Sequence, residues 1–191
     1  MKTNTTLIII DFIHDIVHPD GKLSGKGYSD FITRHGTDKR VGELLLTARS
    51  NHWLICHVRI GFEPDYSDYP ENSPLFGAAK QYNALNKAEW GYEFIDYAKP
   101  LANEPVIAKS RVSAFFNTDL ETILQEHAIS NIFICGCSTD LAVQAVVRDA
   151  HDRDYAVTVV SDACAAATDV DHTSSLSTLA KIAQIKEVGE L

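Results

Sequence analysis

The sequence predicts one α/β domain with a doubly wound, three-layer sandwich fold. Short β-rich apolar runs alternate with segments of helical periodicity along the 191 residues, which favours parallel strands joined by right-handed crossovers. The apolar runs are continuous rather than alternating, and this pattern indicates strands that are covered on both faces. A chain of this length suits a single hydrophobic core, so we expect one domain over residues 1–191.

The order of the predicted elements follows from these runs. The first strand covers residues 5–10 and ends at Asp11, and a helical pattern at 41–50 precedes the second strand at 53–58. After a third strand at 104–108, the motif Thr118-Asp-Leu-Glu121 matches a capping box and predicts a helix that runs to Ala128. The remaining elements are predicted as a strand at 131–135, a helix at 141–151, a strand at 156–160, a helix that begins at Asp171 or Thr173, and an edge strand at 183–185.

Residues 61–100 interrupt this alternation. They are rich in Pro, Tyr, Asp, Asn and Gly, and they contain Trp90 but no strong period. A segment of this length without regular structure is often a functional lid or a contact between subunits. We therefore expect part of it to cover a binding site or to form a subunit contact.

Composition and charge exclude several classes of function. The net charge of −9 makes the surface repel nucleic acid and anionic lipid. No apolar run approaches the length of a membrane span, and the run that follows the N-terminus is too short for a signal peptide. The 4 cysteines lie in or beside apolar stretches without CxxC spacing, so we expect buried, reduced thiols in a cytoplasmic protein.

Candidate functional residues follow the predicted strands, because ligands of open parallel sheets bind beyond the carboxyl ends of the strands. Asp11 follows the first strand, Lys109 follows the third, and residues 136–140 lead from the fourth strand into a helix. An ammonium group beside a carboxylate can hold it in a chosen protonation state, and a helix N-terminus can bind an oxyanion. Judged singly, Asp11 can equally be a turn residue, and Thr139 can be a helix cap. Further residues at strand ends are His57, Arg59, Arg111 and Asp162.

Several blocks of sequence carry a family resemblance. The opening strand reads Leu7-Ile-Ile-Ile-Asp11-Phe, and residues 89–93 read Glu-Trp-Gly-Tyr-Glu. The central block reads Pro105-Val-Ile-Ala-Lys109-Ser-Arg-Val-Ser-Ala-Phe115-Phe-Asn-Thr-Asp119-Leu. The later blocks read Gly136-Cys-Ser-Thr-Asp140-Leu-Ala142-Val, Arg148-Asp-Ala and Ser161-Asp162-Ala-Cys-Ala. In this order they resemble the isochorismatase-like hydrolases, also called the cysteine hydrolase superfamily, over nearly the whole chain.

The resemblance implies a six-stranded parallel sheet with the strand order 3-2-1-4-5-6. It also implies a catalytic site made from Asp11, Lys109 and the residue at position 142. In most members that residue is a cysteine that attacks an amide carbon, while the aspartate acts as a base and the lysine stabilises charge. A cis peptide bond, here between Cys137 and Ser138, often precedes the helix that carries this cysteine.

Position 142 is alanine, so the cysteine mechanism is not available to this chain as it stands. Cys137 lies five residues earlier, and we do not expect it to substitute as the nucleophile. Three interpretations stay open. The chain can resemble the true isochorismatases, which lack the cysteine and cleave a vinyl ether after the aspartate protonates the substrate. It can be a small-amide hydrolase whose catalytic cysteine has been replaced by Ala142, or a non-catalytic binder of small molecules on the same fold.

No metal and no other cofactor are expected. The nicotinamidase branch of this superfamily holds a metal ion with an aspartate and two histidines after the second strand. Here residues 59–66 read Arg-Ile-Gly-Phe-Glu-Pro-Asp-Tyr and contain no histidine. His14 and His18 have the i, i+4 spacing of a metal-binding helix, but Pro19-Asp-Gly follows at once and favours a loop.

The predicted substrate is a small acidic molecule or a small amide. Arg59 and Arg111 are expected to bind a carboxylate, because a guanidinium group can donate two parallel hydrogen bonds to it. The resemblance also implies a homodimer or higher homo-oligomer. The expected substrate-binding residues are Phe12, Arg59, Trp90, Arg111, Phe115, Cys137, Ser138 and Thr139.

Overall fold

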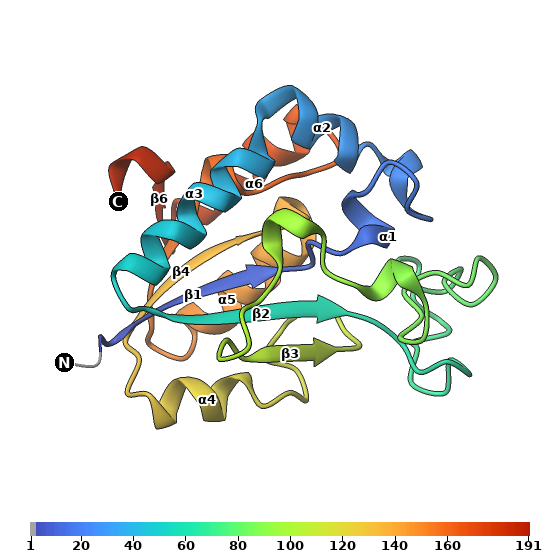
Figure 1. Ribbon diagram of the computed structural model, residues 1–191, viewed down its shortest axis with the longest axis horizontal. Helices are drawn as coiled ribbons and strands as arrows, with labels where there is room; N and C mark the ends of the chain where they lie inside the picture. The colour runs from blue at the N-terminus through green and yellow to red at the C-terminus, as the bar shows by residue number, and fades with distance from the viewer. Residues whose placement is uncertain (1–2) are drawn as a thin grey trace.

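A six-stranded, fully parallel sheet forms the centre of the computed structural model, which describes residues 3–191 (Figure 1). The strand order is β3-β2-β1-β4-β5-β6, and every neighbouring pair is parallel. Both findings confirm the predicted fold class. The strands are β1 (Thr5–Ile10), β2 (Leu54–Ile60), β3 (Val106–Lys109), β4 (Asn131–Gly136), β5 (Ala156–Val160) and β6 (Gln184–Lys186).

The sheet is built around β1, which pairs with β2 on one side and with β4 on the other. Five of its six residues are buried, because both of its faces are covered. Gly136 ends β4 directly opposite Ile10, and a Cβ atom at this glycine would approach the Ile10 Cβ atom to 2.7 Å. A larger residue would therefore push β4 away from β1 at the carboxyl edge of the sheet.

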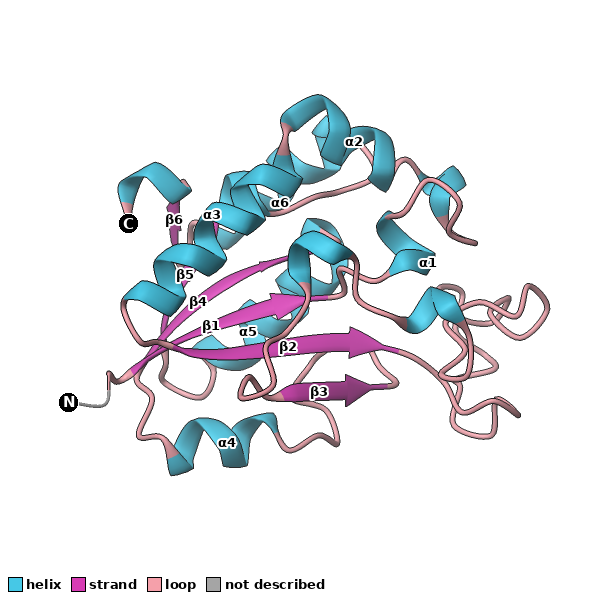
Figure 2. Ribbon diagram, in the orientation of Figure 1, coloured by secondary structure: helices cyan, strands magenta, loops and turns pink. Residues whose placement is uncertain are grey.

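Helices cover both faces of the sheet. The chain moves from β1 to β2 in one direction and from β4 to β5 in the other, so right-handed crossovers place α3 and α5 on opposite faces. Figure 2 shows the strands between the helices, with long loops gathered where the arrowheads of β2 and β3 point. No helix within residues 3–191 is long and apolar enough to cross a membrane. The helices are α1 (His14–Val17), α2 (Tyr28–His35), α3 (Thr37–Ser50), α4 (Leu120–Glu126), α5 (Gln144–His151) and α6 (Asp169–Leu179).

Two helices differ from the sequence prediction because of the residues at their ends. The helix α2 is absent from the prediction, and it lies between Gly27 and Gly36, which have left-handed backbone with φ of 98° and 66°. The helix α6 begins at Asp169, before the predicted start. Its first turn is capped by Thr168, whose hydroxyl oxygen accepts a hydrogen bond from the N–H of Asp171 at 3.1 Å.

Two further helix starts are corrected by the structure. The capping box predicted at Thr118-Asp-Leu-Glu121 is wrong, because the residue before α4 is Asp119 and its side chain makes no capping hydrogen bond. The helix predicted at 141–151 is divided into a π-helical turn over Thr139–Val143 and the regular helix α5. A π-helical turn is rare and often occurs at a functional site.

Residues 61–100 form an irregular segment with two short 3-10 helices, Trp90–Tyr92 and Asp96–Ala98. The buried carboxylate of Asp15 holds this segment against α1, because its Oδ2 atom accepts a hydrogen bond from the N–H of Leu85 at 2.6 Å. An aromatic cluster packs the turns of the segment together. Its members are Phe62, Tyr66, Tyr69 and Phe76.

A buried ionic network lies at the amino edge of the sheet, before β3. The Glu104 carboxylate accepts hydrogen bonds from Arg49 Nε at 2.8 Å and from the N–H of Leu101 at 2.8 Å. His57 Nε2 lies 2.9 Å from the same carboxylate. Burial alone would raise the pKa of Glu104, but the hydrogen bonds from Arg49, Leu101 and His57 outweigh burial and lower it to about 2.

We expect Glu104→Gln to lower the free energy of unfolding at neutral pH by about 1–3 kcal/mol, because the partly buried Arg49 guanidinium loses its charged partner. The pKa of Glu104 is lower in the folded state than in the unfolded chain. The stabilisation is therefore present above about pH 4.5 and is lost as the pH falls toward 2. Denaturant titrations at pH 7 and pH 3 measure both effects.

The control for this prediction is Glu126→Gln, since Glu126 is exposed at the end of α4. The two substitutions should differ clearly at pH 7 and much less at pH 3. Equal losses of stability at pH 7 would contradict the role given to Glu104.

Candidate active site

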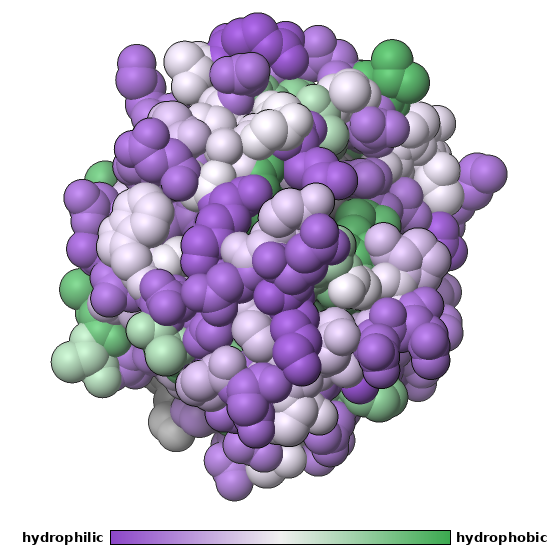
Figure 3. All heavy atoms as spheres, turned by 90° about the vertical axis from the view of Figure 1, so that its right-hand side faces the viewer, coloured by the Kyte–Doolittle hydropathy of each residue, from purple (hydrophilic) through white to green (hydrophobic). Residues whose placement is uncertain are grey.

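A cavity of about 250 Å³ opens at the carboxyl ends of the strands, where the sequence predicts the site. Its lining includes Asp11, Lys109, Cys137, Ser138 and Ala142. Figure 3 views the molecule from this side and shows apolar atoms between mostly hydrophilic side chains. The fold therefore brings together the three positions that the family resemblance implies for catalysis.

Asp11 and Lys109 form a buried ion pair across the intervening strand β2. The Asp11 Oδ2 atom lies 2.7 Å from Lys109 Nζ, and the two side chains are 4% and 1% exposed. Lys109 Nζ also donates to the carbonyl oxygens of Arg111 at 3.2 Å and Val112 at 3.0 Å. An ammonium group has three donors, and these contacts use all three. Lys109 therefore has no donor left for a ligand, and it can affect the cavity only through its charge and its contact with Asp11.

The backbone at Asp11 turns its carboxyl group toward the cavity. Asp11 has left-handed backbone with a φ of 59°, and its N–H donates to the carbonyl oxygen of Val58 at 2.8 Å. The Oδ1 atom is buried and has no hydrogen-bond partner among residues 3–191. Buried polar atoms nearly always have a partner, so this oxygen is the one left free to contact a ligand.

Burial is the largest influence on the pKa of Asp11, and it raises this pKa. The charge and hydrogen bond of Lys109 lower it but do not outweigh burial, so the pKa lies above the ordinary value of 3.8. A proton on this carboxyl group belongs on Oδ1, because Oδ2 already accepts from the ammonium group. Asp11 therefore holds a proton more readily than an exposed aspartate does.

The loop after β4 leads to position 142, the third position that the family resemblance implies for catalysis. The peptide bond between Cys137 and Ser138 is cis, as the family resemblance implies. Ala142 lies in the π-helical turn that follows, and its side chain is buried in the cavity lining. A methyl group thus occupies the position to which the family resemblance assigns the nucleophile.

Cys137 lines the cavity but lacks the properties of a nucleophile. All four cysteines are free and buried, which confirms the sequence expectation. Burial raises the pKa of the Cys137 thiol well above its ordinary value, and the charges of Asp11 and Asp140 raise it further. The reactive form of a cysteine is the thiolate, so Cys137 fits the role of a cavity wall.

The two arginines that the sequence assigns to substrate binding, Arg59 and Arg111, lie outside the lining of this cavity, and their role stays a prediction. Arg59 donates to the carbonyl oxygen of Tyr92 at 3.2 Å, and its guanidinium group lies 4.0 Å from the centre of the Tyr92 ring. Arg111 donates to the carbonyl oxygens of Asp68 at 2.9 Å and Ser110 at 2.7 Å. Both side chains contact residues 61–100, and the Arg59 Nε atom is buried without a hydrogen-bond partner among residues 3–191.

The aromatic residues expected at the substrate also lie outside the cavity lining. Phe12 is buried in the core against Tyr97, with the ring centres 5.8 Å apart. The Phe115 ring lies beneath the Arg153 guanidinium group at 4.6 Å.

Trp90 is the third of these aromatic residues, and it stacks on His14 with the ring centres 4.3 Å apart. His14 begins the short helix α1, so the loop predicted around His14 and His18 is wrong. Trp90 therefore packs on α1 and does not reach the cavity.

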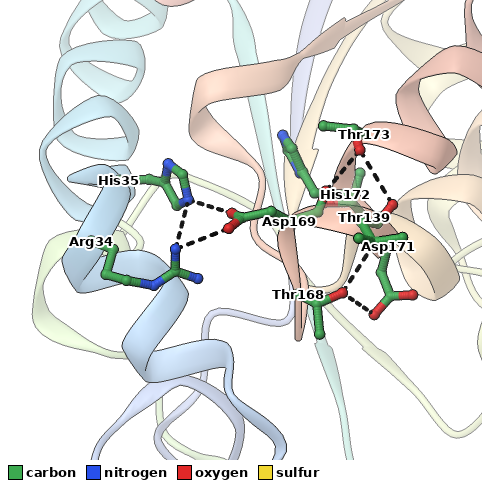
Figure 4. Close-up of polar contacts among 9 residues, drawn as sticks. Arg34, His35, Thr139, Thr168, Asp169, Asp171, His172 and Thr173 are labelled. Carbon is green, nitrogen blue, oxygen red and sulfur yellow. Dashed lines mark hydrogen bonds and ion pairs between the residues drawn. The ribbon is translucent and has the colours of Figure 1, made fainter.

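Thr139 does not line the cavity; it joins the loop after β4 to helix α6 (Figure 4). Its hydroxyl group donates to the carbonyl oxygen of Ala165 at 3.0 Å. Because a hydroxyl group has one proton, the 2.9 Å contact with His172 requires that His172 Nδ1 carries a hydrogen and donates it to Thr139. These contacts join Thr139 to the segment before α6 and to α6 itself, and its role in substrate binding stays a prediction.

The same region joins α6 to α2, as Figure 4 shows. The Asp169 carboxylate lies 3.0 Å from Arg34 Nη1 and 2.6 Å from His35 Nε2. Tyr28, at the start of α2, lines the cavity. These contacts join α2 to α6, and α6 in turn contacts the loop after β4 through His172.

The sequence did not single out the residues that complete the cavity. Most of them belong to two segments, 16–28 and 74–85, of which the second lies in the irregular part of the chain, and the others are Ile60, Val112 and Leu141. The irregular composition of residues 61–100 indicated that part of this segment covers a binding site or forms a subunit contact. In the structure, residues 74–85 form one wall of the cavity. No periodic pattern marks the first segment. The residues in question include Leu23, Lys26, Tyr28, Phe76, Tyr82 and Leu85.

Comparison with known proteins gives the family. The model of the isochorismatase domain matches residues 5–188. The chain belongs to the isochorismatase family. Members of this family are hydrolases, including amidohydrolases.

Individual relatives agree with this assignment. The chain is 25% identical over 171 residues to ureidoacrylate amidohydrolase RutB from Azorhizobium caulinodans, with 83% of this chain and 75% of that protein covered. An isochorismatase family protein from Desulfovibrio vulgaris matches with a TM-score of 0.87 at 25% identity, over 97% of this chain and 95% of that chain. N-carbamoylsarcosine amidase from Thermoplasma acidophilum matches with a TM-score of 0.79 at 25% identity, over 100% and 99% of the two chains.

The residues of this family member do not fit the metal site of the nicotinamidase branch. Residues 59–66 contain no histidine. Across residues 3–191, no group of three His, Cys, Asp or Glu side chains is placed to hold a metal ion. The homo-oligomer implied by the resemblance stays a prediction.

We expect the 4 native thiols to react slowly with iodoacetamide near neutral pH, because all are buried and burial raises the pKa of each. Mass spectrometry should find complete alkylation only after denaturation in guanidinium chloride. Rapid labelling of Cys137 in the native protein would contradict the role given to it here.

Proposed function

We propose that this chain hydrolyses a small acidic molecule in the cavity, with Asp11 as the general acid/base and Lys109 as its charge partner. The observation that carries the proposal is the Asp11 Oδ1 atom, a buried carboxyl oxygen without a partner at the cavity. The raised pKa of Asp11 supports it, since a general acid must hold a proton before it can donate one. Ala142 has no nucleophilic atom, so no covalent intermediate with the protein forms.

The proposed reaction needs one proton transfer in each direction. Protonated Asp11 donates its Oδ1 proton to the substrate, and the bond to the leaving group breaks. One water molecule then supplies a hydroxyl group to the electron-poor carbon and returns a proton to Asp11. The Lys109 ammonium group, 2.7 Å away, stabilises the carboxylate that exists between these two transfers.

We expect Asp11→Asn to reduce turnover by at least about 100-fold, because an amide cannot donate the proton. The assay is a panel of isochorismate, read by pyruvate release, and small ureido acids and amides, read by ammonia release. Circular dichroism and thermal unfolding should be recorded for each variant, because this substitution leaves the Lys109 charge without an ionic partner.

Asp30→Asn is the matched control, since Asp30 is exposed on α2 and outside the cavity lining. It should keep wild-type turnover. A folded Asp11→Asn variant with wild-type turnover would overturn the proposed mechanism, and a wild-type chain without turnover on the whole panel would favour a binding protein.

A second function, amide hydrolysis through a cysteine at position 142, is favoured by the names of the relatives. These are an amidohydrolase and an amidase at 25% identity. The Ala142 side chain lines the same cavity as Asp11, so a thiol here would lie near a carboxyl group that can accept its proton. In this interpretation the alanine has replaced the catalytic residue of a small-amide hydrolase.

Ala142→Cys should then create amidase activity and a thiol that iodoacetamide alkylates in the native protein. Ala145→Cys is the matched control, because Ala145 lies on α5 and outside the cavity lining. The second function is excluded if the Ala142→Cys protein is inert toward the amides and its new thiol reacts no faster than that of Ala145→Cys.

A further inference from the structure

We infer that Lys26 forms an anion-binding subsite at the mouth of the cavity, and that the ligand is a small organic carboxylate with an apolar body. The inference rests on the proposed function, because it concerns the same cavity. The proposed subsite is separate from Arg59 and Arg111, whose guanidinium groups donate to backbone carbonyl oxygens outside the cavity lining.

The charges of the cavity single out Lys26. Three charged side chains contribute to the lining, namely Asp11, Lys109 and Lys26. The Lys109 ammonium group already contacts Asp11 at 2.7 Å and two backbone carbonyl oxygens, so it has no donor left for a ligand. Lys26 is exposed, and within residues 3–191 its ammonium group makes no ion pair or hydrogen bond. It is therefore the cationic group that a ligand can reach in this cavity without breaking a contact.

The backbone holds Lys26 at this position. It ends the 3-10 turn Ser24–Lys26, and its N–H donates to the carbonyl oxygen of Leu23 at 3.0 Å. Gly27 follows with a φ of 98°, and a Cβ atom there would meet the carbonyl oxygen of Ala167 at 2.7 Å. This close approach fixes the turn against the segment before α6, so only the flexible side chain of Lys26 needs to move toward a ligand.

The rest of the cavity indicates the body of the ligand. Most of the lining is apolar, and one wall comes from residues 74–85 of the irregular segment. A ligand that spans from the ammonium group to Asp11 must therefore place apolar atoms between its two polar ends. The volume of about 250 Å³ is below the usual range for drug-sized ligands, about 300–1,000 Å³, so the ligand is small.

The positive charge of Lys26 at the mouth of the cavity also favours an acidic substrate, because the rest of the molecule is negatively charged. The net charge of −9 repels anions from the surface. A cation placed at the opening offsets this repulsion locally and favours a carboxylate over a neutral group of the same shape. Its effect should weaken as the salt concentration rises, because Lys26 is exposed to solvent.

The test compares three probes with the same six-carbon body: hexanoate, hexanamide and hexylamine. NMR titration of the full-length, isotope-labelled protein gives the dissociation constants and shows whether the shifted resonances belong to cavity residues. We expect wild-type protein to bind hexanoate about three- to tenfold more tightly than hexanamide, with a smaller ratio at high salt. Lys26→Gln should remove this preference, and Lys26→Glu should turn it into a preference for hexylamine.

Lys39→Gln is the matched control, because it removes the same charge from an exposed position on α3, outside the cavity lining. It should keep the wild-type preference. The inference is overturned if Lys26→Gln still prefers hexanoate to the wild-type extent, or if hexanoate shifts no resonance of a cavity residue.

These experiments measure binding and need no turnover. Their outcome is therefore independent of the outcome of the test of the proposed function. An active Asp11→Asn variant would remove the proposed mechanism and leave a charge preference at Lys26 intact. An unchanged preference in Lys26→Gln would remove the subsite and leave the role of Asp11 intact.

Discussion

The ion pair between Asp11 and Lys109 joins the ends of β1 and β3 across β2, and water is almost fully excluded from it. Two charges removed from water lose solvation that their mutual attraction only partly replaces. Lys109 recovers part of the loss through two carbonyl oxygens, whereas one oxygen of Asp11 recovers none. A ligand that forms a hydrogen bond with this oxygen therefore stabilises the folded protein as well as the complex.

The sequence was sufficient to predict the sheet and the closeness of Asp11 to Lys109, because both depend on short stretches of chain. The apolar run of β1 indicates a strand buried on both faces, and the polar residue that ends it must lie at the carboxyl edge. The same argument places Lys109 after β3. The family resemblance supplied the strand order, and hence the prediction that only β2 lies between the two side chains.

The walls of the site could not be predicted, because they depend on contacts between distant parts of the chain. Nothing local to Arg111 indicates that its guanidinium group meets the carbonyl oxygen of Asp68, 43 residues away in sequence. The position of Thr139 likewise depends on His172, 33 residues later. The helix α2 has left-handed glycines at both ends and only Phe31 and Ile32 buried, so its apolar pattern is weak.

The irregular wall has a consequence for how this protein can diversify. Residues 74–85 contain no regular helix or strand, and Asp15 holds them to α1 through the N–H of Leu85. Leu75 and Tyr82 lie in this wall with exposed side chains. Substitutions at these two positions can reshape the opening while the strand ends, and the acid they carry, stay where they are. The cavity opening and the strand ends thus belong to separate parts of the chain, so the first can change in shape without moving the second.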